Sequence, residues 1–310
     1  MDFSIVWHAV QSVLTLCCIG CVGYVLARKG WFTPEAKALL PRLVIQVALP
    51  VYMLYNITHS LSRDELLHLA YGVFVPVLSI GVMFCLSFAL GRLLKVPHKR
   101  RGIFYSGCSV SNTIFIGLPV NLALFGEAAL PYVLLYYFGN TVFFWTVGNY
   151  VMAADGEEKV RIFSLATLRR VFSPPMLGFI TAVLLLLLGI PLPDFLLNTA
   201  RILGNLTTPL IIMFIGIMLQ GIRIRAIRPS RELLVILLCR FVVSPLMIVL
   251  ITLFVPLPDL MRQVFVIQSA LPTVAAVSLL SSYYRTDPEF GVLVVSATTL
   301  LSILTIPVTM

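Results

Sequence analysis

Helix-breaking polar residues interrupt two apolar segments of this chain, the first over residues 109–119 and the second over residues 268–276. In a lipid bilayer a helix can be interrupted at mid-depth only where protein or a water-filled cavity receives the freed backbone groups. Paired interruptions in corresponding segments of two halves are typical of the binding site of a transporter. The two stretches are therefore the first candidates for a functional site.

Each stretch carries residues that start a helix. The Ser, Asn and Thr side chains at 109–113 can cap a helix that begins there, and Pro272 lacks an amide hydrogen and is best tolerated in a first helical turn. We therefore expect half-helices to begin at the first break and at residues 271–273. Their unpaired N–H groups and partial positive charge favour an anion. A pair of ordinary kinks repaired by Ser and Thr hydroxyls is the alternative.

Two more polar side chains lie inside apolar segments. Arg240 could pair with a carboxylate substrate through its planar fork of donors, or could bond to backbone carbonyls. Asn140 follows a glycine and offers both donors and acceptors, for a substrate or for a hydrogen bond between helices. The predicted substrate-binding residues are Ser111, Asn112, Thr113, Asn140, Gln268, Pro272 and Thr273, with Arg240 as a possible partner of an anion.

Acidic residues are absent from the apolar segments. All 13 Asp and Glu residues lie in predicted loops or at the ends of spans. A proton antiporter or metal-ion carrier usually needs a carboxylate at mid-depth, because charges there are costly and are kept for function. The sequence also lacks the motifs of intramembrane hydrolysis and of phosphate-binding loops. We expect no enzyme activity, no catalytic residues, no metal site and no cofactor.

The elements that must position these residues are membrane-spanning helices. With 59% hydrophobic residues, 11% charged residues and a mean hydropathy of +1.01, the chain is far more apolar than soluble proteins. We predict an all-α membrane protein of ten transmembrane helices. The predicted spans are 5–27, 38–58, 67–91, 102–124, 129–153, 174–190, 196–220, 232–255, 261–283 and 289–309.

The net charge of +9 is explained by its placement. Lys and Arg gather in the first, third, fifth and seventh connections, while the connections between them hold almost none. By the positive-inside rule the connections rich in Lys and Arg are cytoplasmic. The prediction is a multi-pass protein of the plasma (inner) membrane with both termini outside, in contact with the lipid bilayer and with no nucleic-acid partner.

The chain also divides into two similar halves. Arg101-Gly-Ile-Phe104 opens the fourth predicted span and Arg262-Gln-Val-Phe265 opens the ninth. Because each half has an odd number of spans, the second half must enter the membrane from the opposite side, so the repeats are inverted. The predicted boundaries are 1–153 for the first repeat, 154–173 for a cytoplasmic linker and 174–310 for the second repeat.

Several elements together resemble the auxin efflux carrier family, whose plant members include the PIN proteins, within the bile acid/arsenite/riboflavin transporter superfamily. Asn112-Thr113-Ile-Phe-Ile-Gly117-Leu-Pro119 matches the family's element in the fourth span. Pro272 with Ser281-Ser-Tyr283-Tyr284, the run from Leu300 to Pro307, and Leu49-Pro50 resemble its ninth, tenth and second spans. Plant members place proline where this chain has Ser111.

The resemblance implies a scaffold of spans 1, 2, 6 and 7 and a moving domain of spans 3–5 and 8–10. It also implies elevator-type transport of organic anions near the crossing of the broken spans 4 and 9, commonly in a homodimer, with Asn140 bordering the substrate. We therefore expect a secondary active or facilitated transporter of a small carboxylate. The alternatives are a sodium-coupled symporter, whose cation is held by carbonyls at the breaks, and a membrane ligand sensor without transport.

Overall fold

The computed structural model describes residues 15, 18–60, 62–64, 71–156, 172–221 and 230–305. Every regular element among these residues is helical, and an isolated β-bridge pairs Ser111 with Thr273. The all-α prediction is confirmed for this part of the chain. Most of the predicted linker and both chain termini lie outside the described residues.

The chain folds into two compact units. The first comprises residues 1–71, 114–134 and 172–222, and the second comprises residues 72–113, 135–171 and 223–310. Predicted spans 1, 2, 6 and 7 lie in the first unit. Predicted spans 4 and 5 are divided between the units, because residues 114–134 belong to the first.

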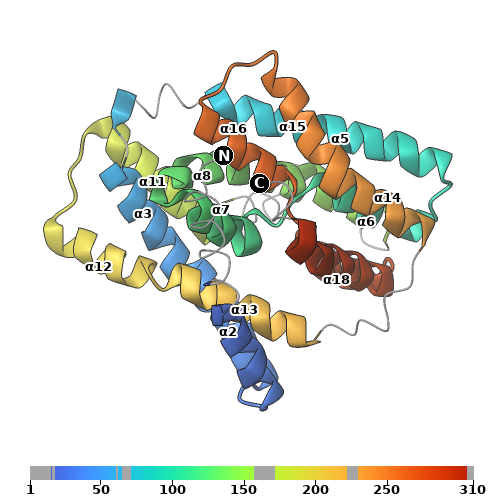
Figure 1. Cartoon of the computed structure of the whole chain (residues 1–310), viewed down its shortest axis with the longest axis horizontal. Helices are drawn as coiled ribbons and strands as arrows, with labels where there is room; N and C mark the ends of the chain where they lie inside the picture. Colours follow the sequence, from blue (N-terminus) through green and yellow to red (C-terminus); the bar gives the residue numbers. More distant parts are fainter. Residues whose placement is uncertain are drawn as a thin grey trace, which may run out of the picture. The chain divides into compact units, whose positions relative to one another are not determined.

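Helices of the first unit pack closely around α3. In Figure 1, α3 lies against α11 and α12. A side chain on Gly178 would come within 2.6 Å of the Pro50 backbone, so the two helices meet where no side chain separates them. The elements are Cys18–Arg28, α2 (Pro34–Leu43), η1 (Val44–Ala48), α3 (Leu49–Ser60), α7 (Leu118–Phe125), η5 (Glu127–Ala129), α11 (Pro174–Leu188), α12 (Asp194–Gly204) and α13 (Thr207–Gly221).

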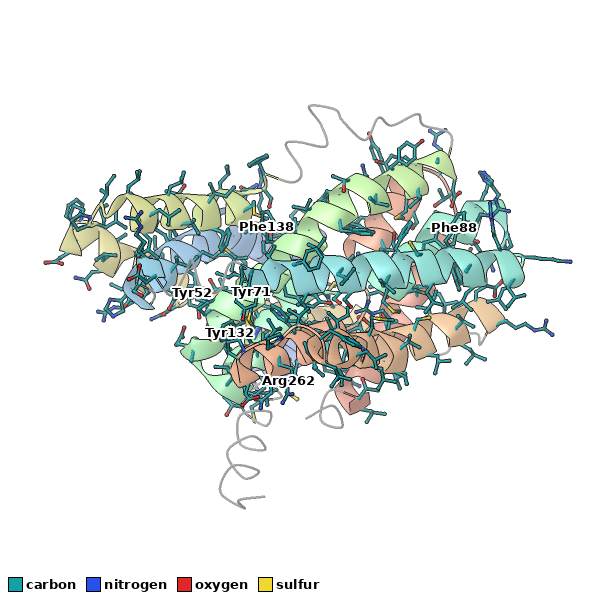
Figure 2. The ribbon with its side chains drawn as sticks, turned by 90° about the horizontal axis from the view of Figure 1, so that it is seen from above. Tyr52, Tyr71, Phe88, Tyr132, Phe138 and Arg262 are labelled. Carbon is teal, nitrogen blue, oxygen red and sulfur yellow. The ribbon has the colours of Figure 1, made fainter. Side chains whose placement is uncertain are left out.

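The second unit holds both breaks. The pairs α5 and α6, α15 and α16, and α17 and α18 pack together, and α5 also packs on α15. Figure 2 shows Phe88 on α5 and Arg262 on α16. The elements are the later part of η2 (Tyr71–Val73), α5 (Phe74–Leu93), η3 (His98–Arg100), α6 (Arg101–Ser109), the later part of α8 (Leu130–Phe143), η6 (Phe144–Gly148), α9 (Asn149–Ala154), α14 (Arg231–Leu238), η8 (Cys239–Val243), α15 (Ser244–Thr252), α16 (Asp259–Ser269), α17 (Ala276–Tyr283) and α18 (Pro288–Thr305).

Short π-helical turns precede prolines in three of the apolar helices. The turns η1, η4 (Thr113–Gly117) and η8 each end two residues before a proline, namely Pro50, Pro119 and Pro245. A proline inside a helix cannot donate the helical hydrogen bond, and its ring clashes with the carbonyl four residues earlier. A wider π turn at that position relieves the clash. In the second unit η8 carries Arg240.

Several helices are suited to a bilayer. Within the part of the chain that the structure describes, four are long and apolar enough to cross one, namely Glu35–His59, Tyr71–Leu93, Asp194–Gln220 and Arg231–Thr252. Shorter apolar helices accompany them, including Thr113–Phe125, Pro174–Leu188 and Pro288–Ser302. The chain is therefore a multi-pass membrane protein, while the count of ten spans and the inverted repeats stay predictions.

Candidate functional site

The two interrupted segments are broken close to where the sequence predicts. The helix α6 ends at Ser109, Val110 is extended, and helical geometry resumes at Thr113. The helix α16 ends at Ser269, and α17 begins at Ala276. We predicted that this second half-helix begins at residues 271–273. It begins later because Thr273 is extended and pairs with Ser111 of the other break.

The two breaks are bonded to each other. The Asn112 amide donates to the Pro272 carbonyl at 2.8 Å, beside the bridge between Ser111 and Thr273. The Thr273 hydroxyl donates to the Gly107 carbonyl at 3.0 Å. Each break thus receives polar groups that the other has freed, which is the condition for interrupting a helix inside a membrane.

Asn140, on α8, holds the first break in its extended form. Its Oδ1 accepts from the Ser111 amide at 2.9 Å, and its Nδ2 donates to the Ser111 carbonyl at 3.0 Å. The Asn140 side chain is buried, so both bonds are shielded from water. It pairs with Ser111 as a neighbouring β-strand would, which leaves a single N–H of its amide for any other partner.

Arg240 joins the two breaks from η8. Its Nε donates to the Leu271 carbonyl at 3.1 Å, and one terminal nitrogen donates to the Cys108 carbonyl at 3.3 Å. The other terminal nitrogen donates to the Ser269 carbonyl at 2.7 Å and to the Ser111 hydroxyl. The residue is 0% exposed, and none of these four partners is a carboxylate. A full positive charge is therefore buried at the crossing without a carboxylate of the described residues bonded to it.

Gln268 lies in the last turn of α16, next to the crossing. It is 0% exposed, and neither its amide oxygen nor its amide nitrogen has a hydrogen-bond partner among the described residues. A buried amide without partners costs stability, so such a group in a native protein needs an explanation. Binding of a polar ligand or of water would supply one.

The start of α17 is the accessible part of the crossing. Val274, Ala275 and Ala276 are half-buried, whereas Leu271, Pro272 and Thr273 just before them are buried. The first hydrogen bond of the turn runs from the Val277 amide to the Val274 carbonyl at 3.1 Å. The amides ahead of it have no intrahelical partner, and they form the positive end of the helix.

The opposite end of α6 is anchored by Asp155, which follows α9. The Asp155 carboxylate accepts from the Gly102 amide in the first turn of α6 at 2.5 Å. Burial raises the pKa of Asp155, and the bond from Gly102 opposes this rise. Close by in the chain, Arg100 pairs with Asp287 at 2.6 Å. The start of this broken segment is thus tied to α9 and to the start of α18.

The structure brings most of the predicted site residues into one network. Ser111, Asn112, Asn140, Arg240, Pro272 and Thr273 are linked by the hydrogen bonds above, Thr113 is buried at the start of η4, and Gln268 precedes the second break. The sequence did not place Thr298 in the site, although its hydroxyl accepts from the Thr273 amide at 3.2 Å. Its polar type inside an apolar segment was the available signal.

No group of three or more His, Cys, Asp and Glu side chains that could hold a metal ion occurs within the described ranges. The crossing is instead built from amides, carbonyls, hydroxyls and one guanidinium. Interrupted helices that exchange hydrogen bonds within an apolar, multi-pass protein are the features of membrane transporters.

Comparison with known proteins gives the family. The sequence matches the family of membrane transport proteins over residues 8–310, and the chain belongs to this auxin efflux carrier-like family. It is 26% identical over 307 residues to an uncharacterized transporter of Methanocaldococcus jannaschii, covering 96% of both chains. It is 27% identical over 310 residues to an uncharacterized transporter of Methanothermobacter thermautotrophicus, again with 96% of both chains covered.

A third relative has a provisional name that includes a substrate. This protein of Rhizobium meliloti is provisionally named a malonate transporter. It is 26% identical to this chain over 295 residues, which cover 92% of this chain and 89% of the relative. The relatives and the family are transporters, in agreement with the sequence analysis.

Proposed function

We propose that this protein carries a small carboxylate, such as malonate, across the plasma membrane as a secondary or facilitated transporter. The main evidence for an anionic substrate is the buried charge of Arg240, whose hydrogen-bond partners are all neutral. A buried positive charge that meets only partial negative charges is costly. An anion bound near the crossing would offset it.

The start of α17 is the proposed place of the carboxylate. The amides of Ala275 and Ala276 precede its first helical hydrogen bond, and both residues are half-buried. Helix N-termini bind carboxylates through unpaired N–H groups and the helix dipole. The unpartnered amide of Gln268 is the proposed second contact, because a dicarboxylate presents acceptors at both ends.

The proposed mechanism is elevator-type alternating access. The crossing lies within the second unit, so this unit would carry the substrate while the first unit stays fixed as the scaffold. The provisional name of the Rhizobium meliloti relative supports malonate as the first substrate to test. The homodimer and the location of both termini outside the cell belong to the same proposal.

The test is uptake of radiolabelled malonate into proteoliposomes that contain the purified protein. We expect saturable uptake that unlabelled malonate inhibits and that malonamide, its neutral analogue, does not. Equal inhibition by malonamide would contradict an anion site. Saturable binding without uptake would favour the sensor over the transporter.

Gln268→Met separates substrate contact from folding. The substitution keeps the volume and removes a buried amide that has no partner, so the melting temperature should stay constant or rise. Malonate uptake should fall at least about tenfold, the loss expected for one hydrogen bond to a charged group. The matched control is Gln220→Met on α13, which should leave uptake unchanged. Normal uptake by the Gln268 variant would remove this residue from the site.

A further inference from the structure

The acceptors around Arg240 are those that an ion-coupled carrier offers to its cation. In transporters with interrupted helices, unwound carbonyls and the C-terminal ends of half-helices coordinate the coupling ion. Here the Cys108 carbonyl lies at the end of α6, the Ser269 carbonyl ends α16, and the Leu271 carbonyl follows in the break. All three accept from the guanidinium of Arg240, as does the Ser111 hydroxyl.

We propose that Arg240 is a built-in cation that takes the place of a coupling sodium ion, so that transport needs no sodium. This inference rests on the proposed transport function, and it addresses the coupling, which that function leaves open. It concerns the acceptors at the helix C-termini, whereas the proposed carboxylate site uses the N-terminal amides of α17.

The charges at the crossing support this assignment. The C-terminal ends of α6 and α16 both carry partial negative charge, and a single cation bonded to both stabilises their approach. Arg240 provides that cation from a third element, η8. A sodium ion at the same acceptors would meet a fixed positive charge at hydrogen-bonding distance, and the two like charges would repel.

The geometry also explains why the residue is an arginine. The planar guanidinium presents five N–H donors in a fixed fork, which here reach acceptors from α6, α16 and the two breaks. A lysine ammonium has three donors on a flexible stem, so it would keep the charge but leave at least one of the four acceptors unpaired. Charge and hydrogen bonding can therefore be separated by substitution.

The first experiment measures melting temperature in detergent and does not depend on substrate. Full-length wild type, Arg240→Ala and Arg240→Lys are compared in sodium chloride, choline chloride and a low concentration of guanidinium chloride. A ligand that binds only the folded state raises its melting temperature. We expect the alanine variant to melt lower in choline and to recover in sodium or guanidinium. Wild type and the lysine variant should melt alike in sodium and choline.

The matched control is Arg231→Ala. Arg231 is an exposed arginine at the start of α14, the helix that leads into η8, and its removal should produce no response to either cation. A sodium-dependent melting temperature of the wild type would overturn the proposal. So would an alanine variant that neither cation stabilises.

The second experiment measures malonate uptake in the same salts. Wild-type uptake should be equal in sodium and choline, and Arg240→Ala should lose more than about tenfold in choline and regain part of it in sodium. Sodium-stimulated uptake by the wild type would contradict the proposal. If the alanine variant cannot be purified, the lysine variant is tested in its place. Because its ammonium keeps the positive charge, sodium-stimulated uptake by the lysine variant would also contradict the proposal. If wild type does not take up malonate, the proposed substrate fails, while the melting temperatures still decide the role of Arg240.

Discussion

The two breaks cross each other but are built differently. In the first, residues 110–113 are all buried, and the amide, carbonyl and hydroxyl of Ser111 are bonded to Asn140 and Arg240. In the second, residues 271–273 are buried, but residues 274–276 at the start of α17 are half-buried. The first break is therefore an anchored support, and the second has the accessible helix end. A binding site assembled from two similar sequence elements need not use them equally.

The substitution with the largest expected effect on stability is Asn140→Leu. It leaves the Ser111 amide and carbonyl without partners in a buried position, and each such group costs about 1–3 kcal/mol. We therefore expect a loss of about 2–6 kcal/mol in the free energy of unfolding, or failure to accumulate in the membrane. Chemical denaturation in detergent would measure it.

Asn205→Ala serves as the control for that variant. Asn205 is an exposed residue in the turn after α12, and its replacement should change the free energy of unfolding by no more than about 0.5 kcal/mol. If Asn140→Leu were as stable as this control, the first break would not depend on its side-chain support.

The next test places a proline in the first break. Ser111→Pro removes the amide that donates to Asn140 and the hydroxyl that accepts from Arg240, so we expect a loss of about 2–4 kcal/mol. Val110 already has the extended conformation that a following proline requires, so backbone clash adds little.

Pro272→Ala is the counterpart in the second break. The Pro272 carbonyl, which accepts from Asn112, is kept in alanine, and the loss should stay below about 1 kcal/mol. Thermal unfolding of the two variants under identical conditions ranks them. Equal losses would mean that the breaks are supported alike.

The smallest effect concerns the start of α6. Because burial raises the pKa of Asp155, the folded protein binds this proton more readily than the unfolded chain does. Stability should therefore fall as the pH rises from about 3.9, the usual aspartate value, through the raised pKa of the folded state. Asp155→Asn can still accept from Gly102 and should remove this slope while keeping the melting temperature at neutral pH equal or slightly higher. If the melting temperature of Asp155→Asn changed with pH as steeply as that of the wild type, Asp155 would be excluded as the source of the pH dependence.

The sequence located both breaks because proline and small polar residues stand out in apolar helices. Partners across the fold were less accessible. The periodicity around Arg240 cannot tell whether its guanidinium reaches a substrate or the carbonyls at Cys108, Ser269 and Leu271, so both roles had to stay open. The start of α17 was placed too early, because the bridge between Ser111 and Thr273 depends on a contact between segments far apart in sequence.

The resident charge of Arg240 has an electrical consequence for the proposed carrier. A sodium ion brings charge across and then leaves, whereas a guanidinium bonded to the chain returns with the protein, so over a full cycle the membrane potential acts only on the charge of the substrate. Moving one charge is worth about 2.3 kcal/mol per 100 mV. In a cell with a negative interior, a potential of about 100 mV would hold the internal concentration of a monocarboxylate about fiftyfold below the external one. An uncoupled carrier of this design would serve the release of carboxylates rather than their accumulation.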